Sequence, residues 1–112
     1  MKIVKSNEAK EFKDGNIFVA YEYNTQDPVI NTARIEIRGR YPGTGSMKNT
    51  QVKELVYVEE GSGEVNINGV NSLISKGDVV FFDKDEQVFW NGNFTLITTC
   101  TPAWSPDQHQ FL

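Results

Sequence analysis

Cysteine and histidine are scarce in this sequence, and their scarcity excludes several kinds of site. The one cysteine, Cys100, has no partner for a disulfide within the chain and supplies neither a structural zinc site nor a redox CxxC pair. We expect it to be a small buried side chain. The one histidine, His109, lies in the segment SPDQHQ, where we expect a packing or solvent-exposed role.

Long basic and long apolar runs are also missing. Eleven Lys and Arg against fifteen Asp and Glu give a formal net charge of -4, and no basic block is available to neutralise phosphates. Apolar runs such as residues 79–82 fall far short of the roughly 20 residues that span a bilayer, and the N-terminus lacks the apolar region of a signal peptide. We therefore expect a cytoplasmic protein that binds neither nucleic acid nor membrane.

What the sequence does have is a series of short segments rich in β-branched and aromatic residues. The alternation of RIEIR and EVNIN is typical of strands with one buried face. Further strands are predicted at residues 17–23, 54–58, 78–82, 87–90 and 94–101. Turn signals begin at residues 14, 41, 60, 68, 75 and 91, and only residues 105–107 predict a helical turn. The chain therefore predicts one all-β domain, residues 1–112, built as a barrel or a sandwich.

The spacing of Glu54 and Gly61 resembles the second half of the first cupin motif, G-x5-H-x-H-x3,4-E-x6-G. Downstream, Gly77 and Asp78 lead into an apolar strand, as they do in the second cupin motif. The two motifs and their spacer cover residues 39 to about 92. The resemblance implies a small double-stranded β-helix, the jelly-roll barrel of a single-domain cupin. It also implies a homodimer, because many cupins pair through exposed strands.

Members of the cupin family typically hold a divalent metal with three histidines and the glutamate of the first motif. Of these ligands the sequence keeps only Glu54. The histidine positions fall on poor ligands for a transition metal, which are Met47 and Asn49, or Lys48 and Thr50 with the shorter spacing, and Val88 or Gln87 in the second motif. We therefore predict no bound metal and no cofactor.

The resemblance also implies that Glu54 points into the barrel, with Val56 and Val58 on its face of the strand and Leu55 and Tyr57 on the other. An inward carboxylate without a metal has two explanations. The first is structural, a pairing with Arg or Lys or hydrogen bonds from amides or a hydroxyl, because an unpaired buried charge is costly. The second is functional, with Glu54 as a general base or as a group that orients a polar ligand.

Three functions remain open for such a barrel. We favour a metal-independent cupin that binds a small polar or carbohydrate-like ligand through the candidate contacts Glu54, Gln87, Asn49, Arg40, Tyr41 and Trp90. The first alternative is a sugar or sugar-phosphate isomerase, epimerase or lyase, with Glu54 as the best candidate for a catalytic residue. The second is a structural or regulatory dimer whose barrel is filled by side chains.

The C-terminal segment CTPAWSPDQH departs from a plain barrel ending. Its two prolines stiffen it, and Trp104 offers a large apolar face that must be buried. We expect the segment to fold back on the barrel or to dock on a second subunit. In the strand before it, alternation puts Cys100 on one face with Phe94. If that face lines the barrel, Cys100 lies near Glu54, with no histidine beside it to activate the thiol.

Overall fold

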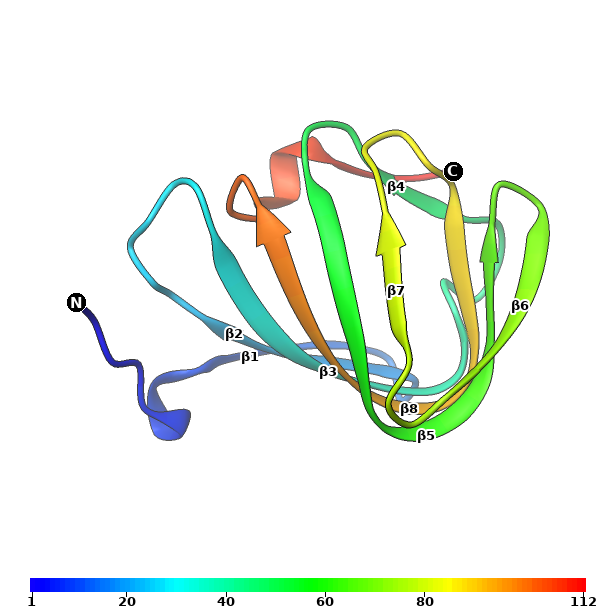
Figure 1. The fold of residues 1–112 in the computed structure, drawn as a ribbon, viewed down its shortest axis with the longest axis horizontal. Helices are drawn as coiled ribbons and strands as arrows, with labels where there is room; N and C mark the ends of the chain where they lie inside the picture. Colours follow the sequence, from blue (N-terminus) through cyan, green and yellow to red (C-terminus); the bar gives the residue numbers. More distant parts are fainter.

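The computed structural model describes residues 1–112 and is built almost entirely of antiparallel strands (Figure 1). The elements in chain order are η1 (Ser6–Glu8), β1 (Lys10–Asp14), β2 (Phe18–Tyr23), β3 (Asn31–Tyr41), β4 (Met47–Asn49), β5 (Lys53–Ile67), β6 (Val70–Ser75), β7 (Val79–Phe82), β8 (Val88–Thr101), η2 (Pro106–Gln108) and β9 (His109–Phe111). Neither short 3-10 turn approaches the length and apolar character that a membrane-crossing helix needs. The all-β barrel predicted from the sequence is confirmed.

Two long strands, β5 and β8, form the centre of the sheet. They pair along their whole length, from Lys53 opposite Thr101 to Ile67 opposite Val88. β8 also pairs with β3, which continues to β2 and β1, whereas β5 pairs with β7 near its start and with β6 near its end. Because both long strands bend, the sheet curls and one of its faces becomes concave (Figure 1). This concave face is the interior of the barrel.

Two of the predicted turns are wrong, because the glycines there lie where β5 and β8 bend. The sequence predicts turns in the segments 60–63 and 91–93, but both segments lie inside the continuous strands β5 and β8. Gly63 and Gly92 stand opposite each other, and a Cβ on Gly63 would lie 2.7 Å from the Gly92 Cα. Gly61 adopts φ 91°, a left-handed conformation that favours glycine. These glycines let two paired strands bend together at a corner of the barrel instead of ending them.

The apolar core lies on the concave face. It comprises the buried residues Ile37, Tyr41, Val56, Val58, Val65, Ile74, Val80, Phe82, Val88, Trp90, Phe94 and Leu96. Trp90 is central, because its ring packs edge to face against Phe82 at 6.3 Å and against Phe94 at 6.0 Å between centroids. Toward the start of β3 and the end of β8, the inward-facing positions change to small or polar residues such as Ala33 and Thr98.

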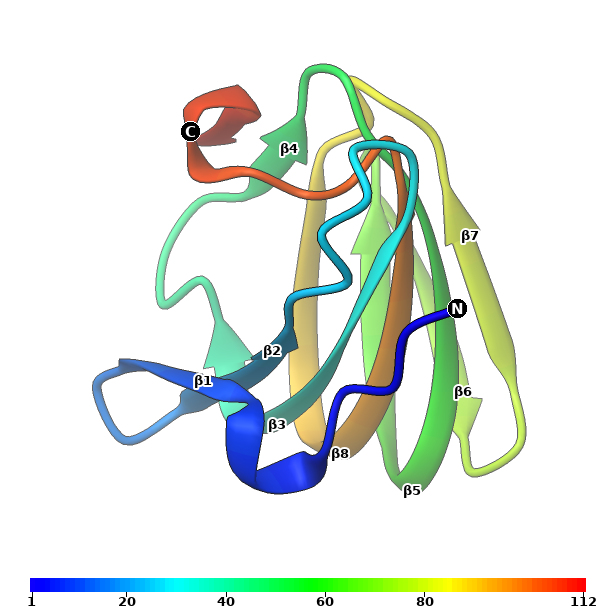
Figure 2. The ribbon, with the colours of Figure 1, turned by 90° about the vertical axis from the view of Figure 1, so that its left-hand side faces the viewer.

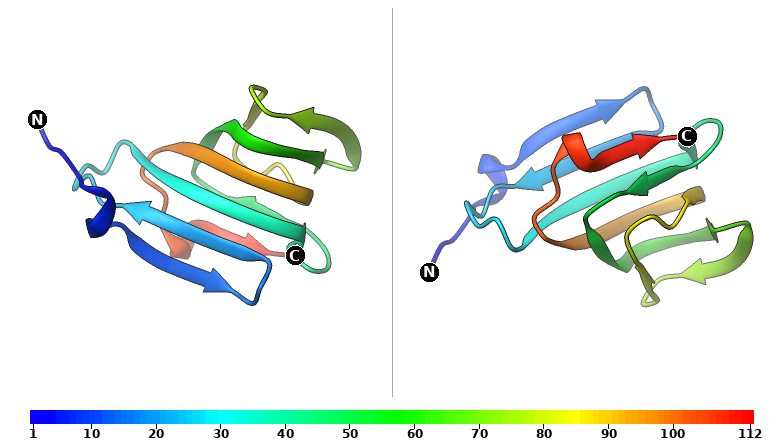
Figure 3. Two further views of the ribbon diagram at one scale, coloured as in Figure 1. Left: turned by 90° about the horizontal axis from the view of Figure 1, so that it is seen from below. Right: turned by 90° about the horizontal axis from the view of Figure 1, so that it is seen from above.

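The C-terminal segment folds back over the concave face. This is one of the two arrangements that the sequence predicts for it. β9 pairs antiparallel with β4, with Met47 opposite Phe111 and Asn49 opposite His109. Figure 2 shows this pair on the side of the barrel opposite β7, and Figure 3 shows the tail lying across the curled sheet when it is seen from above. The tail therefore closes part of the barrel with residues from the far end of the chain.

The convex face keeps several large apolar side chains exposed. Leu55 stands opposite Phe81 and Tyr57 opposite Val79, and all four are exposed. The alternation inferred for β5 is confirmed, because Val56 and Val58 are buried while Leu55 and Tyr57 are not. The homodimer expected from the sequence stays a prediction.

Two leucine truncations test the position of the core. Leu96 is 1% exposed and Leu73 is 86% exposed. We expect Leu96→Ala to lower the free energy of unfolding by about 2 to 5 kcal/mol, because it removes buried methyl groups and leaves a cavity. Leu73→Ala, the matched control, should change it by no more than about 0.5 kcal/mol. Urea unfolding of both variants measures this difference, and equal losses would contradict the core described here.

Candidate functional site

Glu54 projects from β5 onto the concave face and is held by two hydrogen bonds. Its Oε1 accepts from Nδ2 of Asn49 at 2.8 Å, and its Oε2 accepts from Oγ1 of Thr98 at 2.8 Å. No arginine or lysine forms an ion pair with it. Of the partners considered for an inward carboxylate, an amide and a hydroxyl are therefore the ones present.

Asn49 joins Glu54 to the C-terminal tail. Its side chain is almost fully buried, at 2% exposure for the residue, and its Oδ1 is approached by three nitrogen atoms. These are Nε1 of Trp104 at 3.1 Å, Nε2 of Gln108 at 3.0 Å and Nδ1 of His109 at 3.0 Å. We call the connected group the polar cluster, and its members are Asn49, Glu54, Thr98, Cys100, Trp104, Gln108 and His109.

Backbone contacts hold the tail in the position that this cluster requires. The Gln108 carbonyl accepts from the backbone N–H of Thr50 at 2.9 Å and from its hydroxyl at 2.7 Å. The Gln108 Oε1 accepts the backbone N–H of Gln51 at 3.2 Å. Further back, the backbone N–H of Trp104 donates to Oδ1 of Asn31 at 2.9 Å. The tail is thus fastened to both β3 and the segment after β4.

The environment of Glu54 favours the neutral carboxyl more than water does. Although the residue keeps part of its surface accessible, the protein around its carboxylate raises the pKa by desolvation. Hydrogen bonds from Asn49, Thr98 and Cys100 favour the charged form and oppose this rise. The net direction is upward, so Glu54 takes up a proton more readily than an exposed glutamate.

The other two titratable groups of the cluster are also shifted by burial. Cys100 stands directly opposite Glu54 on β8, as the alternation of the strand suggested, and burial together with the Glu54 charge raises the pKa of its thiol. The thiol therefore stays protonated and is a poor nucleophile. Burial lowers the pKa of His109, so its imidazole is held in the neutral form at neutral pH.

The six ligand contacts predicted from the sequence do not all lie together in the structure. Glu54 and Asn49 lie together, whereas Gln87 is exposed and its side chain makes no hydrogen bond. The Arg40 guanidinium donates to the carbonyls of Pro42 at 2.6 Å and Gly45 at 2.9 Å, so its fork holds a loop. Ligand binding by any of the six stays a prediction.

The two aromatic members of that set also have structural partners. Trp90 is buried in the core. Tyr41 stacks on Phe18 at 4.2 Å and donates its hydroxyl to Oδ2 of Asp14 at 3.0 Å. Burial and the Asp14 carboxylate raise the pKa of the Tyr41 phenol, so it remains a hydrogen-bond donor at any physiological pH.

Strand alternation decides between the alternative histidine positions. Met47 packs against the core and Asn49 is buried, so both face inward, whereas Lys48 points toward Asp85 with 3.9 Å between Nζ and Oδ1. In the second motif Val88 is buried. The inward positions are therefore Met47, Asn49 and Val88.

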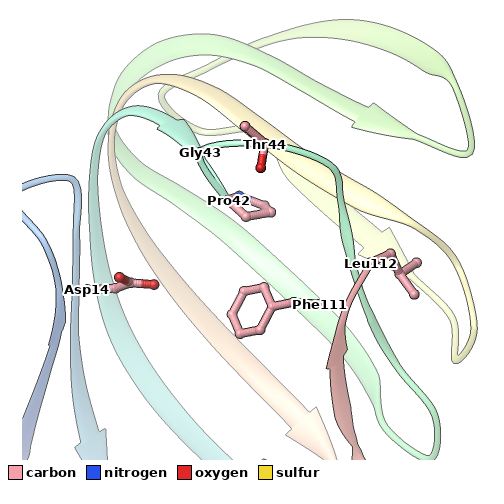
Figure 4. A pocket seen from close by; sticks show the side chains of 6 residues that line it. All are labelled: Asp14, Pro42, Gly43, Thr44, Phe111 and Leu112. Atoms are coloured by element: carbon pink, nitrogen blue, oxygen red, sulfur yellow. The ribbon is translucent and has the colours of Figure 1, made fainter.

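A hollow of about 520 Å³ lies beside Phe111 (Figure 4), whose ring also packs edge to face against His109 of the polar cluster. It is lined by Asp14, Pro42, Gly43, Thr44, Phe111 and Leu112. Figure 4 shows the Phe111 ring projecting into this space. Neither Glu54 nor Asn49 borders it, so the hollow and the polar cluster are separate features that share one wall.

Several residues that flank the polar cluster are only partly buried. Asn31, Ala33 and Ile35 face inward on β3, yet all three keep part of their surface exposed. Trp104 and His109, on the tail opposite, are also only half-buried. In contrast, the inward residues near the glycine corner are fully enclosed. The residues of β3 and the tail that flank the polar cluster are therefore less enclosed than those near the glycine corner.

Sequence reasoning missed the contribution of the tail to this site. Trp104 was identified as a residue that must be buried, and His109 was given no role in the site. A signal was present, since Trp104, Gln108 and His109 all carry nitrogen donors within the segment that folds back. Their convergence on one oxygen depends on a turn that the sequence pattern does not specify.

The curled jelly-roll and its inward glutamate define a small cupin. Residues 32–98, more than half of the chain, match the family model of the EutQ-like cupin domain. The chain belongs to this family. A comparison with curated proteins finds no match.

Several solved structures share the fold. Streptomyces PAC13 with uridine has a TM-score of 0.90 at 15% identity, covering 100% of this chain and 91% of that one. KdgF from Halomonas sp. has a TM-score of 0.75 at 15% identity, with coverages of 96% and 97%. Ectoine synthase from P. lautus has a TM-score of 0.76 at 16% identity, with coverages of 100% and 90%. At these identities the likeness establishes the fold alone.

The residues at the cupin metal position do not fit a metal ion. Both Glu54 oxygens already accept hydrogen bonds, and the Asn49 oxygen is enclosed by tail nitrogens. No group of three or more His, Cys, Asp or Glu side chains is arranged to hold a metal. The chemistry of this site therefore has to come from its amide, carboxyl and imidazole groups.

Removing the Asn49 side chain tests the junction between barrel and tail. We expect Asn49→Ala to lower the free energy of unfolding by about 2 to 4 kcal/mol, because buried donors on Trp104 and Gln108 lose their acceptor. Asn91→Ala is a matched control, since Asn91 is exposed and its side chain makes no hydrogen bond. It should change stability by no more than about 0.5 kcal/mol. Denaturant unfolding followed by tryptophan fluorescence compares the two.

Glu54→Gln tests the raised pKa. Because the folded-state pKa of Glu54 lies above its ordinary value of 4.5, the stability that it contributes is full below that value and declines as pH rises through the folded-state pKa. Glutamine can accept from Asn49 with its oxygen and donate to the Thr98 hydroxyl with its amide nitrogen. Because it does not titrate, the variant should gain stability relative to the parent as pH rises. Urea unfolding across a pH series gives this difference, and a pH-independent difference would contradict the shift.

Proposed function

We propose that the protein binds a small polar ring compound, carbohydrate-like or nucleoside-like, on the concave face between β3 and the C-terminal tail, and that it does so without a metal. The observation that carries this proposal is the buried polar cluster on the concave face, flanked by partly buried residues of β3 and the tail. The members of the cluster form hydrogen bonds with each other. The cluster lies beside half-buried residues that face inward.

The arrangement suits a ligand with both a ring and hydrogen-bonding groups. The Trp104 and His109 rings lie 5.5 Å apart between centroids, and the His109 and Phe111 rings lie 5.0 Å apart and perpendicular. Aromatic faces of this kind bind flat or ring-shaped ligands, and the nearby amide and carboxyl groups supply orientation. On β3 the inward position opposite Thr98 is the small residue Ala33.

The comparisons support the ligand class without fixing it. PAC13 is described with uridine and as a nucleoside dehydratase, and it is similar to this chain over its full length. Uridine and other nucleosides are accordingly reasonable first compounds, together with sugars and sugar acids.

An enzymatic role is the second candidate, and the raised pKa of Glu54 favours it. A carboxyl whose pKa is raised by burial suits a group that takes up and releases a proton. A sugar or nucleoside isomerase, epimerase or lyase would use such a group. The filled-barrel alternative finds partial support in Trp90, Phe82 and Phe94, which occupy the interior near the glycine corner.

A thermal-shift and calorimetric screen tests the proposed function. We expect at least one nucleoside, sugar or sugar acid to raise the melting temperature, because a ligand at about 100 times its Kd stabilises the folded state by about 2.7 kcal/mol. Prior dialysis against a chelator should leave the binding unchanged. Failure of every ring compound would favour the filled barrel, and one tightly held transition metal per chain would refute the metal-independent reading.

A further inference from the structure

The position of Trp104 fixes the orientation of the Asn49 amide. An indole N–H only donates, so the Asn49 atom that lies 3.1 Å from Trp104 Nε1 has to be the oxygen. The orientation of the Gln108 amide agrees, because its Oε1 accepts a backbone N–H and its Nε2 therefore points to the same Asn49 oxygen. The Asn49 Nδ2 is left facing Glu54, as observed.

The amide orientation in turn fixes the tautomer of His109. Nδ1 of His109 lies 3.0 Å from the Asn49 oxygen, which only accepts, so Nδ1 carries the hydrogen. In the neutral imidazole Nε2 then has a free lone pair. Burial lowers the pKa of His109 and keeps this neutral form populated at neutral pH.

The free nitrogen of His109 is accessible from outside. Every buried side-chain nitrogen and oxygen atom in the structure has a hydrogen-bond partner, and Nε2 of His109 has none, so it reaches the surface of the protein. Because β9 alternates, His109 shares its face of the strand with Phe111, whose ring packs edge to face against Tyr41 on the concave sheet. Nε2 is therefore an unpartnered acceptor between aromatic rings.

We propose that Nε2 of His109 is the hydrogen-bond and proton acceptor for the ligand, taking an acidic N–H or O–H of a ring that packs beside Trp104 and Phe111. Asn49 is the positioning residue that sets the tautomer. When the proton transfers, the ring compound becomes an anion and the imidazole an imidazolium. Glu54, on the far side of Asn49, then offsets the new positive charge. This inference rests on the proposed function for the identity of the ligand. The contacts of His109 from which it is argued are those of the protein without ligand.

A ligand-free measurement decides the tautomer. Because the chain contains a single histidine, a long-range ¹H–¹⁵N spectrum of uniformly labelled protein shows one imidazole only. We expect a protonated Nδ1 and an unprotonated Nε2 at neutral pH. Trp104→Phe, which removes one competing donor, should keep this tautomer, because the Gln108 amide still turns the Asn49 oxygen toward His109. A parent protein with its hydrogen on Nε2 would overturn the proposal.

Acylation with diethyl pyrocarbonate tests whether Nε2 is reactive and accessible. We expect His109 to be modified in the folded protein, before unfolding, with the site assigned by mass spectrometry of peptides. Protection of His109 until the protein unfolds would overturn the proposal. Neither this readout nor the tautomer depends on any ligand, so both remain decisive if the proposed function fails.

Two substitutions then link the nitrogen to binding, with uridine as the probe. His109→Asn keeps an N–H near the position of Nδ1 but lacks the acceptor, and it should fold normally while uridine affinity falls about tenfold, the equivalent of 1.4 kcal/mol. His109→Gln, whose side-chain oxygen can reach the position of Nε2, should recover part of this loss. Gln110→Asn, on the exposed face of β9, is the control and should bind like the parent.

The outcomes separate the two proposals. Unchanged uridine affinity in a folded His109→Asn variant refutes the role of His109 while leaving the binding site in place. Absence of uridine binding to the parent counts against the nucleoside form of the proposed function, and the tautomer and acylation results then judge His109 alone.

Discussion

The carbonyl oxygen of Asn49 is the point on which the site depends. A carbonyl oxygen has two lone pairs, and this one faces nitrogen donors from three residues of the tail. The amide nitrogen of the same side chain donates to Glu54. Buried polar groups are retained only where such partners exist, because each unpaired group costs on the order of 1 to 3 kcal/mol. The tail therefore cannot leave the barrel without exposing or orphaning several donors at once. Docking of the tail and assembly of the polar cluster therefore depend on the same hydrogen bonds.

Much of the fold was predictable because local signals agreed. Alternating segments, β-branched residues and glycine-rich turns indicated an all-β barrel, and the spacing of Glu54 and Gly61 indicated its type. The two wrong turns have a physical origin. Glycine marks both a reversal of the chain and a close approach of two bent strands, and only the pairing of Gly63 with Gly92 tells them apart. That pairing is long-range information.

The site was predictable only where it follows strand geometry. The inward direction of Glu54 was implied by the motif resemblance, its proximity to Cys100 follows from strand alternation, and both hold. Asn49 was found through motif spacing. The tail residues came from no periodic pattern, because a segment with two prolines and a 3-10 turn carries no repeat from which a face can be assigned. Arg40 and Tyr41 were predicted from residue type alone, and in the structure their side chains hold a loop and meet a neighbouring carboxylate.

The division of the site between β5 and β8 on one side and the tail on the other has a consequence for how such a protein can change. Glu54 and Thr98 belong to the same paired strands that carry Val56 and Leu96, so a slip of one residue would turn core and site outward together. The tail carries none of this core, because its side chains are placed by a short turn and by the pairing of β9 with β4. Substitutions there can alter which group meets a bound molecule while the barrel stays as it is. The side chains of the C-terminal segment can thus be replaced while the sheet that supports them stays unchanged.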